Sequence, residues 1–354
     1  MPKGTYFWGG AGLLALAVPF LFATPYFLSI MVLFFIYVAI NLMWGLVLGT
    51  AGLQSFATVA IVGIGAYVAT FLTVKAGRDD LTNFDYPAYP WYIGVIAATI
   101  VGVIVGAIVA LPAMRLRGIY FALLTIGLVE LVRAYVTDDQ ERLGGAQGLY
   151  GAATFIPADM IGTDGGFQLA YYAALALAIA ALIIYRLVAY GRLGLLLRAA
   201  RESEPFAEAL GVHIIRSRFA VFLISSGMLG LIGGFYSAYY RAISPSFFQF
   251  STVLLLFAMI IVGGLNSPRG IIIGTALVLF VDQRFKELGA PRLVLLGFVL
   301  LLITLLARDG LAGVPAQIRS WVRGGKDGNE ADPGTTAETG ETAAPPGPAA
   351  ASQS

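Results

Sequence analysis

Residues 192–218 read RLGLLLRAARESEPFAEALGVHIIRSR, a charged segment between two long apolar runs. No charged residue occurs in residues 165–185 before it or in residues 219–240 after it. Because a charged side chain at the centre of a bilayer costs about 2.5–3.5 kcal/mol on insertion scales, this segment cannot lie in hydrocarbon. The pattern predicts a water-exposed loop over 189–217 that joins two membrane spans and is long enough to form helices of its own.

The composition places the whole chain in a membrane. Hydrophobic residues make up 58% and charged residues only 12%, whereas soluble domains carry about 25% charged residues. Residues 4–74 contain no Asp, Glu, Lys, Arg or His, which at about 20 residues per span is enough for three helices and too long for a signal peptide. We therefore predict an all-α polytopic protein of the cell (inner or plasma) membrane, with the lipid bilayer as its solvent.

About ten transmembrane helices are expected along the chain by the criterion of about 20 apolar residues. Gly263, Gly264, Pro268 and Gly270 interrupt the last apolar runs, so some of those spans are expected to be short, tilted or discontinuous. The expected spans are 7–23, 28–48, 56–74, 91–113, 118–136, 167–187, 218–240, 251–266, 270–284 and 292–307.

The distribution of basic residues predicts the orientation. If the N-terminus is cytoplasmic, 14 of the 22 Lys and Arg residues face the cytoplasm, as the positive-inside rule requires. Both termini and the 189–217 loop are then cytoplasmic. Residues 1–314 form the transmembrane domain, and residues 315–323 form an interfacial helix or a plain linker. Residues 324–354, which are rich in Gly, Pro, Ala and Thr without an aromatic residue, are expected to be a disordered cytoplasmic tail.

The chain lacks the motifs of an enzyme or a self-powered pump. None of the four lysines lies in a phosphate-binding loop, the lone His213 supports no Ser/His/Asp set, and the absence of cysteine excludes a disulfide framework. Glu130 is the main carboxylate within the spans, although proton-coupled carriers usually need such groups. We expect no catalytic residue, metal site, bound cofactor or nucleic-acid partner, and we infer that energy arrives through the cytoplasmic loop.

The middle of that loop has the signals of a short helix. Ser203 is a good N-cap, and Glu204 and Pro205 suit a first helical turn. Gly211 suits the position just after the helix. Because a helix of about two turns is unstable alone in water, it needs a partner surface. The helix either docks on a separate protein or lies on the cytoplasmic face of its own chain.

The stretch GRLGLLLRAARESEPFAEALGVHIIRSRFAVFLISS resembles the coupling-helix region of the LivM-type permease subunits of branched-chain amino acid ABC importers. LRGIYFALLTIGLVELVR (116–133), GGAQGL (144–149) and the two blocks AISPSFFQF and VGGLNSPRG (within 242–270) also resemble that family, and GLVLGTAGLQSFATVAIVGIGAY (45–67) does so more loosely. The resemblance covers roughly residues 28–314. One departure lies at Phe56-Ala57-Thr58, where the family usually has Leu-Gly-His, and it weakens any inference about the substrate.

The resemblance implies a set of partners and a role for the loop. The partners would be a homologous LivH-type permease subunit, two cytoplasmic ABC ATPase subunits that use ATP and Mg, and an extracytoplasmic substrate-binding protein. The chain would carry branched-chain or related hydrophobic amino acids inward. The residues expected to couple ATP hydrolysis to transport are Arg198, Arg201, Glu202, Ser203, Glu204, Pro205, Phe206, Glu208, Ala209, Leu210 and Gly211.

Residues of the substrate pathway are harder to assign from sequence. Gln54, Ser55 and Thr58 are polar positions in the loosely matching block and are candidates near a cytoplasmic gate. Tyr67 either contacts substrate or anchors a span end at the interface. Two further candidates, Thr125 and Glu130, share one helix, where Glu130 alternatively only pairs with Arg133 at i, i+3.

Other functions stay open at this stage. Permeases of this kind also serve urea, amides and other small organic acids, and the binding protein generally sets selectivity. An ion-coupled secondary transporter is a second class, which would work without cytoplasmic ATP. A membrane-bound lipid or glycan transferase would need a cluster of catalytic polar groups at one interface, which the outer loops do not display.

Overall fold

The computed structural model describes residues 24–74, 89–113, 116, 118–202, 207–208, 213–265 and 267–285, together with Pro19 and Gly297. The chain divides into two units, residues 1–314 and 315–354, and every described residue lies in the first. The expected spans at 7–23 and 292–307 lie almost wholly outside the described residues, as do the expected interfacial helix and tail. The orientation of the termini stays a prediction.

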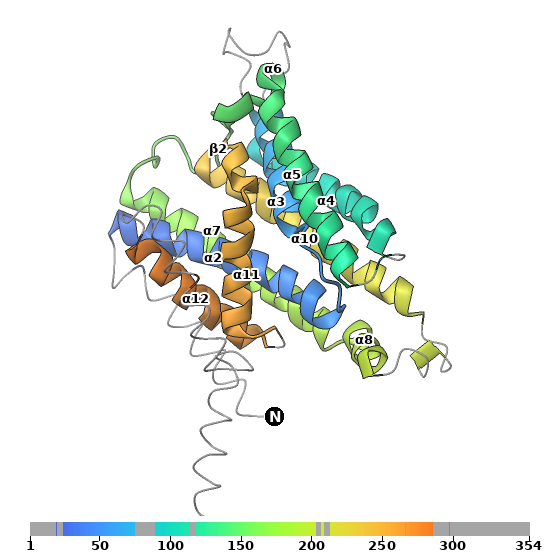
Figure 1. The fold of residues 1–354 in the computed structure, drawn as a ribbon. Coiled ribbons are helices and arrows are strands. Elements are labelled where there is room, and N and C mark those ends of the chain that lie inside the picture. Colours follow the sequence, from blue (N-terminus) through green and yellow to red (C-terminus); the bar gives the residue numbers. More distant parts are fainter. Residues whose placement is uncertain are drawn as a thin grey trace, which may run out of the picture. The chain divides into compact units, whose positions relative to one another are not determined.

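The described residues form a bundle of long apolar helices (Figure 1), which confirms the all-α polytopic prediction. Within the residues that the structure describes, five helical segments are long and apolar enough to cross a membrane: α2 with its π-helical end η1, α4, α5, α7 and α10. The expected spans from 28–48 to 270–284 each correspond to one helix. These are α2 (Pro25–Gly45), α3 (Thr58–Thr73), α4 (Trp91–Ala113), α5 (Ile119–Asp138), α7 (Asp164–Ala189), α10 (Ile214–Tyr240), α11 (Phe250–Gly263) and α12 (Pro268–Arg284).

Shorter elements connect these helices. The chain leaves α2 through the π-helical turn η1 (Leu46–Thr50), and α8 (Arg192–Glu202) follows α7. The remaining elements are α6 (Gln140–Leu143), the 3-10 turns η2 (Gly145–Gln147) and η3 (Pro245–Phe248), and the strands β1 (Leu149–Tyr150) and β2 (Ala242–Ile243).

Helix α10 lies at the centre of the bundle and packs closely on α3 and α4. The close approach depends on small residues. A Cβ at Gly230 would collide with the carbonyl oxygen of Ala98 on α4, and a Cβ at Gly233 would collide with that of Val62 on α3. Lipid gives helices no hydrophobic reason to associate, so contacts between backbones of this kind stabilise a membrane bundle.

A second group of helices consists of α2, α7, α11 and α12, of which α2 and α7 contact α10. Helices α2 and α12 are joined by a buried polar contact, because the amide of Asn41 donates to the hydroxyl of Thr275 at 3.0 Å. The same amide group lies 3.3 Å from the sulfur of Met259 on α11. Such interhelical bonds fix the register of helices whose remaining contacts are apolar.

The two ends of the bundle differ. One end carries the antiparallel pair β1–β2, with Leu149 opposite Ile243, and there Arg241 donates from Nε to the carbonyl oxygen of Ala152 at 3.4 Å. The other end carries α8 and the loop between η1 and α3. Under the predicted orientation the α8 end is cytoplasmic.

Candidate functional site

The predicted coupling helix lies largely outside the described residues. Positions 203–206 and 209–212 are outside, so the roles of Ser203, Glu204, Pro205, Phe206, Ala209, Leu210 and Gly211 stay predictions. Arg201 and Glu202 end α8, and their side chains are outside the described part. Between the two gaps, Ala207 and Glu208 are helical. Ala207 is buried and Glu208 is exposed, so this short turn has one face on the protein and one face on solvent.

Helix α8 lies against the end of the bundle. Leu197 and Ala200 are buried, whereas Arg198 and Ala199 between them are exposed. The turn from α7 into α8 is tight, since a Cβ at Gly194 would collide with the carbonyl oxygen of Ala189, the last residue of α7. The sequence therefore produces an amphipathic helix with its apolar face on α7, α10 and η1.

Arg198 has a partner inside its own chain. One of its terminal nitrogens donates to the carbonyl oxygen of Ala189 at 2.7 Å, and its guanidinium carbon lies 5.0 Å from the ring centroid of Tyr190. The last carbonyls of a helix lack intrahelical donors, and a basic side chain near them is favourable. Arg198 thus caps α7 and holds α8 against it.

The loop of residues 51–57 (the 51–57 loop) is where several helices meet at the α8 end. The indole nitrogen of Trp44 donates to the carbonyl oxygen of Ser55 at 2.6 Å. The backbone N–H of Phe56 donates to the hydroxyl of Thr125 on α5 at 2.9 Å. Nε of Arg218, near the start of α10, donates to the carbonyl oxygen of Ala51 at 3.2 Å. The loop is thereby tied to α2, α5 and α10.

The predicted pathway residues in this loop and at the first position of α3 separate into buried and exposed positions. Ser55 and Thr58 are buried, and Gln54 is exposed. Phe56, where the chain departs from the LivM-type pattern, packs its ring 5.7 Å from that of Trp44 and 5.2 Å from that of Phe257 on α11. Phe56 stands where that pattern has Leu, and its ring closes an aromatic cluster behind the loop. The His of the pattern corresponds to Thr58, which is buried here.

Thr125 is fully buried and uses its hydroxyl twice. Its oxygen accepts the Phe56 N–H and lies within 3.0 Å of the carbonyl oxygens of Phe121 and Ala122 one turn earlier. A hydroxyl can accept and donate at once, so one side chain satisfies a loop N–H while remaining bonded to its own helix. The sequence analysis predicted Thr125 as a pathway residue but did not predict its hydrogen bond with Phe56.

Tyr67 lies on the wall of an apolar groove between α3 and α5. Its ring stacks on Phe248 with centroids 5.9 Å apart, and its buried hydroxyl has no hydrogen-bond partner among the described residues. The groove encloses about 480 Å³. Its lining is almost wholly apolar: Ile64, Tyr67, Val68, Phe71, Leu72, Leu131, Val132, Tyr135, Val136, Leu143 and Phe248, with Asp139 and Arg142 also contributing.

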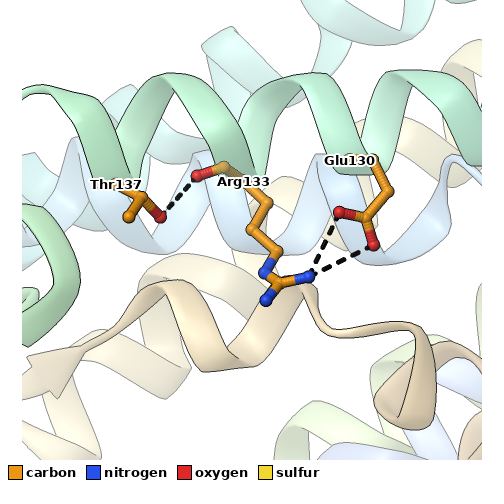
Figure 2. A network of polar contacts seen from close by, with 3 residues as sticks. All are labelled: Glu130, Arg133 and Thr137. Atoms are coloured by element: carbon orange, nitrogen blue, oxygen red, sulfur yellow. Dashed lines mark hydrogen bonds and ion pairs between the residues drawn. The ribbon is translucent and has the colours of Figure 1, made fainter.

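Glu130 pairs with Arg133, as their i, i+3 spacing predicts. A guanidinium nitrogen of Arg133 lies 3.2 Å and 3.4 Å from the two carboxylate oxygens of Glu130 (Figure 2). The next turn carries Thr137, whose hydroxyl donates to the carbonyl oxygen of Arg133 at 2.8 Å. Both charged side chains are partly exposed on α5.

Sequence reasoning missed three residues that organise this region: Asn41, Trp44 and Arg218. Asn41 is fully buried and joins α2 to α11 and α12. A single Asn in a span without charged residues was the available signal. Trp44 and Arg218 both bond to carbonyl oxygens of the 51–57 loop, and such contacts cannot be read from a sequence because backbone carbonyls occur everywhere.

The chain has relatives among known families and proteins. The family model described as "Branched-chain amino acid transport system / permease component" matches residues 26–306. The LivM permease protein of the high-affinity branched-chain amino acid transport system of Escherichia coli K12 is 25% identical over 319 residues, covering 84% of this chain and 72% of the relative.

Two other relatives extend the comparison. A probable LivM permease protein of Methanocaldococcus jannaschii is 25% identical over 273 residues, covering 70% of this chain and 78% of the relative. The LivH permease protein of Escherichia coli K12 is 24% identical over 293 residues, covering 79% of this chain and 92% of the relative. No solved structure gives a significant match.

Proposed function

The chain belongs to the family of branched-chain amino acid transport system permease components, and from that membership we propose that it imports branched-chain or related hydrophobic amino acids as one subunit of an ABC importer. The observation that carries the proposal is the family match, which spans the membrane core from α2 to beyond α12. The chain is a multi-pass protein of the inner membrane and resembles LivM more closely than LivH over the longer alignment.

The proposed machine has further subunits. A LivH-type permease would stand beside this chain, two cytoplasmic ATPases would bind and hydrolyse ATP with Mg, and an extracytoplasmic binding protein would deliver the substrate. The resemblance to both LivM and LivH proteins supports a partner built on the same fold. The chain's own sequence contains no phosphate-binding loop. In this proposal it binds the ATPases, moves when they hydrolyse ATP and conducts the substrate across the membrane.

Coupling to the ATPases would run through residues 203–211. The described turn at Ala207 and Glu208 supports this role, because it is attached to the protein on one side and open on the other. The contact between Arg218 and Ala51 and that between Phe56 and Thr125 would pass a displacement of the loop to α5. Such a movement reaches a gate when a rigid set of contacts switches between two discrete arrangements.

Uptake by the reconstituted complex tests the proposal. This chain, its LivH-type partner and both ATPases are placed in proteoliposomes with ATP inside, and accumulation of labelled leucine is measured with the binding protein outside. We expect uptake that needs both ATP and the binding protein. Uphill uptake by this chain alone under an ion gradient would overturn the proposal in favour of a secondary transporter.

The substrate class is tested separately on the binding protein. Calorimetric titration with leucine, isoleucine and valine is compared with titration by urea, short amides and small organic acids. Tight binding of the branched-chain amino acids supports the proposed substrates. Exclusive binding of urea or amides would keep the ABC permease role and replace its substrate.

A further inference from the structure

Two helices of the bundle expose very different faces. The exposed side of α4 is purely apolar along its length, with Ile96, Ile100, Ile104 and Ile108 about a turn apart. The exposed side of α5 includes charged side chains, Glu130 and its partner Arg133. Among the described helices long enough to span a membrane, α5 alone exposes charged side chains away from its ends.

By length and hydropathy α5 is a candidate membrane span, and its charged pair lies within the helix and not at its first or last residues. Glu130 is eleven residues after Ile119, the first residue of α5, which at 1.5 Å per residue is about 17 Å along a helix of about 30 Å. The hydrocarbon core of a bilayer is about 30 Å thick. Leu131 and Val132, next to the pair, line the groove with Tyr67 of α3, a shorter apolar helix.

A lipid-facing position is therefore unfavourable for this face of α5. Ionisable side chains within spans almost always face the bundle interior or a water-filled cavity. Within the part of the chain that the structure describes, the pair is not enclosed, since the two side chains are 40% and 46% exposed. This face therefore suits contact with water, with another protein chain or with a part of this chain outside the described residues, whereas the face of α4 suits lipid.

Gly127 lies at the centre of the exposed face of α5. Seven residues later, Ala134 lies on the same line, and Glu130 and Thr137 flank that line on one side. A Cβ at Gly127 would meet nothing within 4 Å, although glycine within a helix costs about 0.5–1 kcal/mol relative to alanine. No contact within the described part of the chain explains a glycine there, in contrast to Gly230 and Gly233.

We propose that the face of α5 centred on Gly127 lines the water-filled substrate passage at the boundary with the second permease subunit, with Glu130 and Arg133 as its charged edge. The inference rests on the proposed permease function and adds where the passage runs. A zwitterionic amino acid carries one ammonium and one carboxylate group, and a neighbouring carboxylate and guanidinium would lower the cost of bringing both into the membrane. The apolar edge of this face of α5, at Leu131 and Tyr135, would contact the side chain of the amino acid.

Thiol accessibility tests the proposal directly, because the chain contains no cysteine. Gly127→Cys and, as the lipid-facing control at similar depth, Ile104→Cys are each assembled with the partner permease and ATPases in lipid nanodiscs. A charged, membrane-impermeant methanethiosulfonate is added, and the mass of this chain is followed over time. The thiolate attacks the sulfur of such a reagent, forms a mixed disulfide and releases methanesulfinate, and the thiolate forms in water and not in hydrocarbon.

We expect the Gly127→Cys thiol to react at least about tenfold faster than the Ile104→Cys thiol. Equal slow rates, with no cross-link to the partner, would show that this face of α5 does not meet water and would overturn the proposal. Slow labelling with disulfide formation to a cysteine placed in the partner would show a dry subunit interface and overturn it too. If Gly127→Cys does not assemble, Ala134→Cys with Ile100→Cys as control makes the same comparison.

Leucine uptake by the wild-type complex separates the two levels of inference. Rapid labelling of the Gly127→Cys variant without ATP-dependent uptake by the wild-type complex would contradict the proposed function and leave the water-filled face in place. Normal wild-type uptake with slow labelling would contradict only the position of the passage.

Discussion

Thr125 shows how a single hydroxyl connects a membrane helix to a loop. It is fully buried, and Phe56 donates its backbone N–H to it. A buried N–H without an acceptor costs about 1–3 kcal/mol, so the loop has a definite energetic reason to stay against α5. The sequence indicated Thr125 only as a polar residue in a span.

Replacing Thr125 with valine removes this acceptor and keeps the side-chain shape. We expect Thr125→Val to lower the stability of the folded chain by about 1–3 kcal/mol, because the N–H of Phe56 loses its partner. The apparent melting temperature in detergent measures the effect. Thr99→Val is the matched control, since among the described residues the Thr99 hydroxyl bonds to the carbonyl oxygen of Val95 in its own helix and to no other element. Equal melting temperatures for the two variants would contradict the role given to Thr125.

The Glu130–Arg133 pair leads to a second prediction at this scale. Because the two side chains are about half exposed, the pair should contribute only about 0–1 kcal/mol to stability. We expect Glu130→Gln and Arg133→Gln to leave the apparent melting temperature of the assembled complex nearly unchanged and to lower the rate of leucine uptake. A large loss of stability in either single variant, restored in the double variant, would instead indicate a desolvated pair.

At the residue scale, the sequence could predict only interactions between residues that lie close together along the chain. The i, i+3 pairing of Glu130 with Arg133 followed from helix geometry and is confirmed. The bond from Asn41 to Thr275 joins residues 234 positions apart, and nothing local selects that partner. The missing hydrogen bond of Tyr67 also depends on neighbours from another element.

At the scale of elements, the hydrophobic pattern predicted most helices and missed how they end. The expected span 28–48 crosses the point where α2 gives way to the π-helical η1. That irregular end leads into the 51–57 loop, whose bonds come from Trp44, Thr125 and Arg218. Periodicity reports which residues avoid water, and it does not report where distant side chains stabilise an irregular backbone.

The corner between α7 and α8 gives a prediction for an element. Gly194 lies so close to the carbonyl oxygen of Ala189 that a methyl group would collide with backbone, which cannot move without displacing α8. We expect Gly194→Ala to lower the apparent melting temperature and to weaken co-purification of the ATPases. Gly165→Ala, near the start of α7, is the control because its nearest neighbour would be the Thr163 hydroxyl at 3.8 Å. Equal melting temperatures and equal co-purification of the ATPases in both variants would contradict the inference that the turn between α7 and α8 requires glycine at position 194.

For the whole molecule, the contacts at the α8 end form a continuous route from the loop toward α5. Helix α8 packs on α7 and α10, α10 bonds to the 51–57 loop through Arg218, and the loop bonds to α5 through Thr125. Helix α5 carries the face that we assign to the passage. A force applied at residues 203–211 thus has a short path through bonded elements to the site of transport.

The proposed route makes its sharpest prediction at Glu208. Ala207 is buried and anchors the turn, so a change at the exposed neighbour Glu208 should leave the fold of the chain intact. An ATPase surface that accepts the Glu208 carboxylate would repel a guanidinium at the same position, since unlike charges attract and like charges oppose association. We expect Glu208→Arg to abolish leucine uptake in proteoliposomes while ATP hydrolysis continues and the apparent melting temperature is unchanged.

The matched control is Glu141→Arg, which makes the same charge change on an exposed residue of α6 at the opposite end of the bundle, near Asp139, which caps that helix, and Arg142. It should retain coupling between hydrolysis and uptake, because no ATPase reaches that end under the predicted orientation. Coupled transport by the Glu208→Arg variant would contradict the proposal that residues 203–211 transmit the movement of the ATPases. Loss of coupling in Glu141→Arg with normal coupling in Glu208→Arg would invert the orientation of the whole bundle, since the ATPases would then contact the strand-bearing end.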